Sequence, residues 1–270
     1  MPTIPAEPAR ESHKARDMAE SFGTDAERYD RTRPSYPDAM VERIVAASPG
    51  RQVVDVGCGT GIVARQFQAA GCTVLGVEID ARMADVARRY GIDVEVSSFE
   101  TWDTEGRRFD AVVAGQTWHW VDPAAGAAKA AEALRPGGRL ALFWNVGIPP
   151  ADLSTAFADV YRRVVPGFPV YDAAKQAKQA NGYSVFLDNA AEGLRAAGGF
   201  DEPEQWSFDW TRNYTKDEWL DQVPTSGGIS RLAPEQVAEL LSGTGAALDA
   251  VGGEFTMTYT AVVLTAARAC

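Results

Sequence analysis

The stretch VVDVGCGTGIVARQF, residues 53–67, decides the fold of this chain. It begins with residues 53–56, which have the character of a buried strand, and three glycines follow at every second position, Gly57, Gly59 and Gly61. The apolar residues after them have helical spacing. A strand, a tight glycine turn and a helix bring a ligand against bare backbone and a helix N-terminus. The stretch therefore predicts a ligand-binding turn in an α/β domain.

The glycine spacing indicates which ligand this turn binds. A dinucleotide site has the pattern G-x-G-x-x-G, and its third glycine would stand where this chain has Ile62. Asp55 lies two residues before the first glycine, where it would repel a pyrophosphate but suit a cation such as an ammonium or a sulfonium. Because no Lys-Ser or Lys-Thr pair follows, a nucleoside-triphosphate loop is also disfavoured.

The sequence VVDVGCGTG resembles the first motif of the class I S-adenosylmethionine-dependent methyltransferases. The resemblance continues through VLGVEID (74–80), FDAVVAGQTWHWVDP (109–123) and ALRPGGRLALFWN (133–145), and it covers residues 20–145. It implies an α/β, Rossmann-like fold with a seven-stranded, mostly parallel sheet, helices on both faces and an antiparallel last strand. Residues 146–200 break the alternation of strands and helices, so we expect a helical cap insertion there.

The expected organisation has four parts. They are a flexible arm (1–18), lid helices (19–50), a methyltransferase core (51–145 and 201–270) and the cap (146–200), which we expect to set substrate specificity. Within the cap the sequence predicts helices over 153–165, 172–180 and 190–197, and its aromatic candidates for facing an acceptor are Phe168, Tyr171, Tyr183 and Phe186.

The resemblance also implies which residues bind the methyl donor, S-adenosylmethionine. Glu78 ends the second strand, where a carboxylate can accept hydrogen bonds from both ribose hydroxyls. Tyr29 and Arg33 belong to the lid, and a guanidinium suits the carboxylate of the donor. The other residues expected at the donor are Asp55, Gly57, Cys58, Gly59, Thr60, Gly61, Ile79, Met83, Ser98, Phe99 and Gln116.

Several of these residues also have purely structural interpretations. Tyr29 can pack under the sheet, Arg33 can be solvated, and Met83 can belong to the core. Many members of the family have an acid where this chain has Ser98, so this serine would be a weaker partner for the adenine amine.

The turn GQTWHW, residues 115–120, follows the fourth strand, at the edge where open α/β sheets place their chemistry. His119 is a candidate general base because its reference pKa lies near neutrality, or else a structural histidine bonded to backbone. Trp118 and Trp120 can form an apolar wall that attracts the charged donor or can fill the space beneath the next helix, and we expect one to do each. Asn145 ends the fifth strand. The candidate catalytic residues are thus His119, Trp118 and Asn145.

The predicted reaction is methyl transfer by in-line displacement to a small-molecule acceptor. The lid segment and the Trp-His-Trp turn resemble a subgroup that includes trans-aconitate methyltransferases, which esterify a carboxylate. A carboxylate or hydroxyl oxygen is therefore the leading expectation for the acceptor. The alternatives are a natural-product amine or carbon acceptor, a non-catalytic adenosylmethionine-binding protein, and a nicotinamide-dependent dehydrogenase, which the missing third glycine disfavours.

Composition excludes several other classes. The 270-residue chain has a formal net charge of −11, which argues against a nucleic-acid partner because phosphate binding rests on Lys and Arg. Cys58, Cys72 and Cys270 lack CxxC spacing, so we expect neither a disulfide framework nor a metal site. No signal peptide and no stretch of about 20 apolar residues is present. We therefore expect a cytoplasmic monomer or homodimer without a membrane partner.

Overall fold

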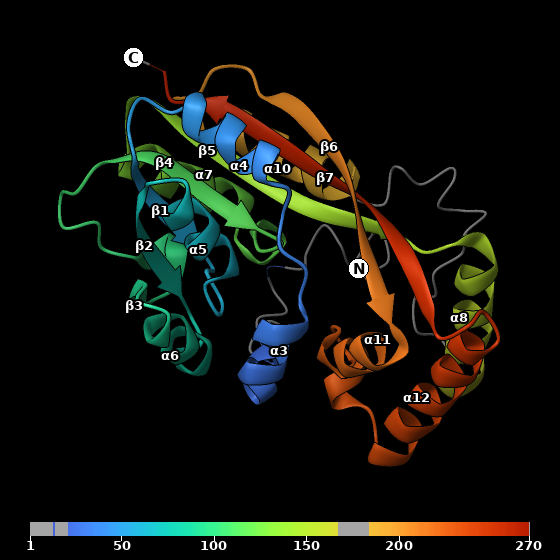
Figure 1. Cartoon of the computed structure of the whole chain (residues 1–270). Helices are drawn as coiled ribbons and strands as arrows, with labels where there is room; N and C mark the ends of the chain where they lie inside the picture. The colour runs from blue at the N-terminus through green and yellow to red at the C-terminus, as the bar shows by residue number, and fades with distance from the viewer. Residues whose placement is uncertain (1–12, 14–20, 167–183, 270) are drawn as a thin grey trace.

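The computed structural model describes residues 13, 21–166 and 184–269 (Figure 1). The strands are β1 (Gln52–Val56), β2 (Thr73–Glu78), β3 (Asp93–Val96), β4 (Phe109–Gly115), β5 (Leu134–Ile148), β6 (Glu204–Thr215) and β7 (Glu254–Ala267). The α-helices are α3 (Ala26–Thr32), α4 (Asp38–Ala46), α5 (Ile62–Ala69), α6 (Ala81–Arg89), α7 (Pro123–Ala133), α8 (Ala151–Val164), α10 (Ser184–Ala197), α11 (Lys216–Gln222) and α12 (Pro234–Asp249). Short 3₁₀ helices are η2 (Ser21–Asp25), η3 (Phe99–Thr101), η4 (Trp118–Trp120), η5 (Val223–Thr225) and η6 (Ile229–Arg231).

The strands form one seven-stranded sheet in the order β3-β2-β1-β4-β5-β7-β6. Strands β1 to β5 are parallel to one another, whereas β7 runs antiparallel to both β5 and β6. The order reverses at β1, which places the carboxyl ends of β1 and β4 at the switch point where α/β sheets bind ligands. The predicted fold class, with its antiparallel last strand, is confirmed.

The glycine turn between β1 and α5 needs residues without a side chain. Gly57 and Gly59 have φ values of +58° and +55°, in the left-handed region that favours glycine. A Cβ atom on Gly57 would also overlap the side chain of Thr117 in the neighbouring turn. Gly61, with φ +85°, is the N-cap of α5. Between β1 and α5 the backbone of the turn is therefore open to a ligand at the edge of the sheet.

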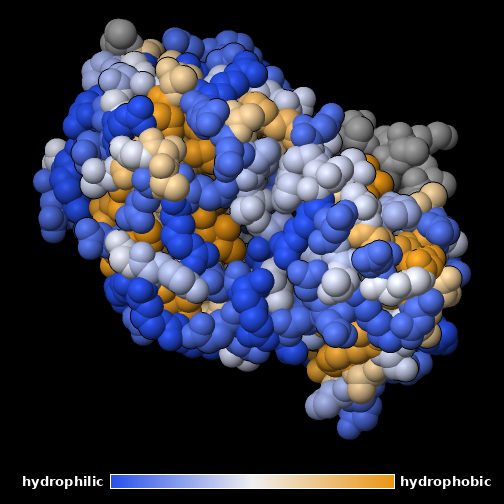
Figure 2. Space-filling view, viewed as in Figure 1, coloured by the Kyte–Doolittle hydropathy of each residue, from blue (hydrophilic) through white to orange (hydrophobic). Residues whose placement is uncertain are grey.

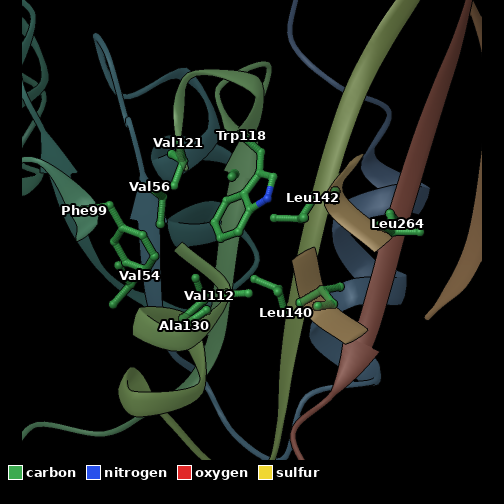
Figure 3. Close-up of a cluster of buried hydrophobic side chains, with 14 of the residues drawn as sticks. Val54, Val56, Phe99, Val112, Trp118, Val121, Ala130, Leu140, Leu142 and Leu264 are labelled. Carbon is green, nitrogen blue, oxygen red and sulfur yellow. The ribbon is translucent and has the colours of Figure 1, made fainter. Parts of the chain in front are cut away.

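Helices cover both faces of the sheet and bury two apolar layers. Helices α4 and α5 pack on one face around Ile44 and Phe67, which are fully buried. Helices α7 and α10 pack on the other face, and Figure 3 shows part of that layer, where Trp118 lies over Leu142 beside Val121. Full burial of a large apolar side chain contributes roughly 1.5–3 kcal/mol, so these layers supply much of the folding free energy.

The two described helices of the predicted cap pack on different parts of the molecule. Helix α8 lies against α12 and shares a third apolar cluster with α11, at one end of the molecule in Figure 1. The described part of helix α10, Ser184–Ala197, covers more residues than the predicted helix over 190–197, and its Phe186 packs in the apolar layer beside α7. The predicted helix over 172–180, the arm apart from His13, and Phe168, Tyr171 and Tyr183 lie outside the described residues.

The surface agrees with the acidic, polar composition. Figure 2 shows hydrophilic residues over most of one face, with apolar residues in smaller patches between them. Across the described ranges, none of the helices has the length and apolar character needed to cross a membrane.

Candidate functional site

A cavity opens at the edge of the sheet where β1, β2, β4 and β5 end. It is lined by every residue predicted to bind the donor except Gly61, and also by His119 and Asn145. Gly61 instead fits close to Ala87 and Ile92, and its left-handed φ starts α5, so it shapes the turn without lining the cavity. The local motifs of the sequence thus converge on one place, as expected for strand ends of a parallel sheet.

Glu78, at the end of β2, braces the glycine turn. Its Oε2 accepts a hydrogen bond from the backbone N–H of Gly59 at 2.7 Å, and its Oε1 accepts one from the N–H of Asp80 at 2.9 Å. Burial raises the pKa of this carboxyl group above its usual range. Each carboxylate oxygen retains a second lone pair, so Glu78 can still accept hydrogen bonds from a ligand diol.

Asp55 is the most unusual polar group of the cavity. Its side chain is 1% exposed, and Oδ2 is buried without a partner among the described residues. Burial, reinforced by the charge of Glu78, raises the pKa of Asp55 well above its ordinary value. The nearby Thr60 hydroxyl is buried and unpartnered as well. A buried carboxyl group of this kind is costly unless a cation or a hydrogen-bond donor meets it.

Arg33, which follows α3, contributes the cation of the site. Arg33 lies 4.8 Å from the ring centre of Tyr29 and donates a hydrogen bond to the carbonyl of Thr225. Its Nε is buried without a partner in the described part of the chain. Asp221 of α11 accepts hydrogen bonds at 2.8 Å from the Nε atoms of Arg28 and Arg31, which join α3 to α11 (Figure 1).

The turn after β4 has a strained backbone at the cavity. Gln116 has a φ of +57°, a value that costs a non-glycine residue energy and often occurs at functional sites. Its backbone N–H bonds to the carbonyl of Phe143 at 2.8 Å, and its side-chain amide donates to the carbonyl of Asn145 at 3.3 Å. Gln116 is therefore held at the junction between β4 and β5.

His119 lines the cavity but is poorly suited to the predicted role of general base. Its Nδ1 accepts a hydrogen bond from the indole N–H of Trp144 at 3.3 Å, which places the proton of the neutral ring on Nε2. Burial lowers the pKa of His119 to about 3. The ring also stacks on Phe186, with 4.6 Å between centres. His119 is thus a neutral aromatic wall with a weakly basic ring.

Of the two tryptophans in this turn, only Trp120 lines the cavity. Trp118, predicted as a catalytic residue, is 2% exposed and packs into the core against Phe99 and Leu142 (Figure 3). That part of the prediction is wrong, because the 3₁₀ turn η4 directs the two side chains to different surroundings. The expectation that one tryptophan faces the site and the other fills the core agrees with this arrangement.

Asn145 has its side-chain amide engaged by the protein. Its Nδ2 donates to the carbonyl of Ser35 at 3.0 Å, and its Oδ1 accepts from the indole of Trp210 at 3.1 Å. Trp210 stacks in turn on Tyr259, with 4.6 Å between ring centres. Asn145 therefore connects the lid segment to β6 and holds the cavity wall in position.

The sequence analysis missed the cavity residues that come after residue 200. These are Trp219, Gln222, Ser226, Gly227, Met257 and Tyr259. The alternation along β7 predicts that Met257 and Tyr259 share a face, but it does not reveal that this face borders the ligand. Within the described residues, His, Cys, Asp and Glu side chains form no group of three or more that could hold a metal ion.

Known proteins resemble this chain in sequence and in fold. Residues 54–142 match the family model of a methyltransferase domain. An uncharacterized methyltransferase of Mycobacterium tuberculosis (strain H37Rv) is 39% identical over 133 residues, which are 48% of this chain and 54% of that protein. A ubiquinone biosynthesis O-methyltransferase of Alkalilimnicola ehrlichii is 31% identical over 108 residues, 37% of this chain and 44% of that protein. The chain spans about half the length of these curated relatives.

One solved structure shares the fold over most of the chain. It comes from Anaeromyxobacter dehalogenans, is assigned as a type II methyltransferase, and superposes with a TM-score of 0.62 at 19% sequence identity. The match covers 86% of this chain and 97% of that one. Residues 54–142 are thus similar to a methyltransferase domain, and the chain as a whole shares the fold of that solved structure.

Proposed function

We propose that this protein transfers a methyl group from S-adenosylmethionine to an oxygen atom of a small-molecule acceptor. One observation supports the proposal above the others. The buried Oδ2 atom of Asp55, which has no partner among the described residues, lies in the same cavity as a glycine turn that Glu78 braces. A site of this kind favours a ligand that is cationic at one end and carries hydroxyl donors at the other.

The residues of the cavity fit the groups of the donor. Asp55 offers an unsatisfied acceptor to an ammonium, and Glu78 offers free lone pairs to a ribose diol. The unpartnered Nε of Arg33 suits the carboxylate of the donor. Ile79 is 37% exposed for a large apolar side chain, so an adenine ring would cover it.

The mechanism needs orientation more than acid–base chemistry. When bound, the donor supplies a methyl group that its sulfonium already activates. Gln116, fixed by Phe143 and Asn145, forms the wall between the two strand ends where we place the reacting groups. Trp120 and the neutral ring of His119 exclude water from that wall. Alignment of this kind can lower a barrier by roughly 7–11 kcal/mol in favourable cases.

One named relative supports the choice of oxygen as the acceptor atom. The relative from Alkalilimnicola ehrlichii is named as an O-methyltransferase and is 31% identical to this chain over 108 residues. A carboxylate acceptor would need no base, and a hydroxyl acceptor would release a proton to water. The oligomeric state, monomer or homodimer, remains a prediction.

The test combines calorimetry with product release. The full chain is titrated with S-adenosylmethionine, and S-adenosylhomocysteine release is followed with small carboxylic acids, phenols and alcohols. We expect Asp55→Asn to weaken donor binding at least tenfold, because the neutral amide cannot offset a positive charge. Asp201→Asn, at an exposed acid outside the cavity, is the matched control. Equal affinity of wild type and Asp55→Asn would contradict the donor site.

Binding without acceptor-dependent release would support a non-catalytic adenosylmethionine-binding protein. Tight binding of NADH in place of the donor would support a dehydrogenase. Both outcomes would overturn the proposed reaction.

A further inference from the structure

The cavity continues beyond the predicted donor residues to side chains that come from distant parts of the chain. Trp219 and Gln222 belong to α11, and Met257 and Tyr259 belong to β7. Phe186 of α10 also lines the cavity, and its ring stacks on His119. The tryptophan, glutamine, methionine and phenylalanine side chains have no charged form. Burial keeps the other two rings of this wall neutral, because it lowers the pKa of His119 and raises the pKa of Tyr259.

The charges of the whole lining set a limit on the acceptor. Among the described residues that line the cavity, Arg33 is the single arginine or lysine, whereas Asp55, Glu78 and Glu100 are acidic. The donor has a carboxylate of its own, and Arg33 is assigned to it in the proposed function. No further cation of the described lining is left to meet an acceptor carboxylate. A buried carboxylate without a partner is strongly disfavoured.

Gln222 presents an unpaired hydrogen-bond acceptor in the same cavity. Its side chain is 5% exposed, and its Oε1 is buried with no hydrogen-bond partner in the described structure. An unpaired amide oxygen in a cavity needs a hydrogen-bond donor from a ligand. A hydroxyl group has such a proton, whereas a carboxylate has only lone pairs and would repel this oxygen.

The aromatic side chains of the same wall favour an acceptor with a flat, apolar ring. Trp120, Phe186, Trp219 and Tyr259 all line the cavity, and Tyr259 is held by the stacked ring of Trp210. Aromatic side chains offer large faces that pack against planar rings. Met257 adds a flexible side chain that adapts to the shape of an apolar ligand.

We propose that the acceptor is an uncharged aromatic hydroxyl compound, and that Gln222 selects it by accepting a hydrogen bond from its hydroxyl group. This inference rests on the proposed function and names the substrate class of that site. In the reaction, an oxygen–carbon bond forms as the carbon–sulfur bond of the donor breaks. The sulfur keeps the electron pair, and the hydroxyl proton passes to water.

The first experiment compares two matched sets of probes on the wild-type chain. Simple phenols and benzoic acids with the same ring substituents are assayed by S-adenosylhomocysteine release. We expect turnover of phenols, with kcat/KM at least tenfold higher than for the matching benzoic acids. Benzoic acids that react as well as phenols would overturn the inference, and so would donor binding without turnover of any phenol. Failure of the wild type to bind the donor would instead overturn the proposed function.

The second experiment tests Gln222 itself. Gln222→Met keeps the length of the side chain and removes both hydrogen-bonding atoms. We expect KM for the best phenol to rise at least tenfold, while the calorimetric affinity for S-adenosylmethionine changes less than twofold. Gln205→Met, at an exposed position of β6, is the control. An unchanged KM in Gln222→Met would overturn the role of Gln222. If that variant does not fold, the comparison of phenols with benzoic acids still decides the substrate class.

Discussion

Glu78 accepts a hydrogen bond from the backbone N–H of Gly59 at 2.7 Å, so the carboxylate at the end of β2 holds the glycine turn that follows β1. The residue predicted to bind the ribose is therefore also a structural brace. Its two functions can be separated, because the brace acts without ligand and the ribose contact does not. The same carboxylate accepts from Asp80, which caps α6, so one side chain fixes two ligand-facing segments.

Replacing Glu78 should therefore lower stability in the absence of any ligand. Glu78→Ala leaves two backbone N–H groups without their acceptor, and we expect a loss of about 1–3 kcal/mol in the free energy of unfolding. Urea denaturation of the ligand-free protein measures this, with Glu42→Ala, at an exposed position of α4, as the control. If Glu78→Ala were as stable as wild type, the brace would have no energetic role.

The raised pKa of Asp55 should appear as a pH dependence of stability. Above the ordinary carboxyl pKa of about 3.9, the unfolded chain has released this proton while the folded chain retains it. The folded state then binds more protons, so the free energy of unfolding falls as pH rises toward the raised pKa. Urea denaturation at a series of pH values should show this decline in wild type and a weaker decline in Asp55→Asn. Identical slopes would contradict a raised pKa at Asp55.

His119 should remain neutral across the physiological range. Burial lowers its pKa to about 3, whereas an unfolded histidine titrates near pH 6.5. We expect the ring proton resonances of His119 to stay constant between pH 5 and 8, a range chosen to bracket the ordinary value of about 6.5. A His119→Gln variant assigns the signals against those of His13. Titration of His119 near pH 6.5 would restore it as a candidate base.

Because the backbone of Gln116 is strained, a glycine at this position should make the protein more stable than an alanine does. A non-glycine residue in the left-handed region costs roughly 1–2 kcal/mol, and glycine avoids that cost. Gln116→Gly and Gln116→Ala both remove the side-chain amide, so they differ mainly in backbone strain. We expect the glycine variant to be the more stable of the two by about 1 kcal/mol in urea denaturation. A more stable alanine variant would mean that the turn is not strained.

The sequence brings the predicted donor residues to one cavity because their motifs are local. The glycine turn, Asp55 and Glu78 lie at the ends of adjacent strands, and parallel strands bring such ends together. Spacing alone therefore places them in one cavity. The pattern cannot show which way Trp118 and Trp120 turn, because a single 3₁₀ turn has no apolar face long enough to read.

The rest of the cavity depends on tertiary packing. Gln222 reaches the cavity only because α11 docks on α3 through Asp221 and its two arginine partners. Asn145 has the right position but a different role, since Ser35 and Trp210 occupy its amide. Contacts between residues so distant in the chain leave no signal in one sequence. Apart from Trp120 and Phe186, the residues that would recognise an acceptor were consequently the ones that sequence analysis missed.

The most direct test of the central claim is isothermal titration of the wild-type chain with S-adenosylmethionine, with NADH added in a competing titration. The account predicts saturable binding of S-adenosylmethionine that NADH does not displace, because a cation stabilises the ionised form of Asp55 and a pyrophosphate does not. Absence of S-adenosylmethionine binding, with saturable binding of NADH at the same cavity, would contradict it.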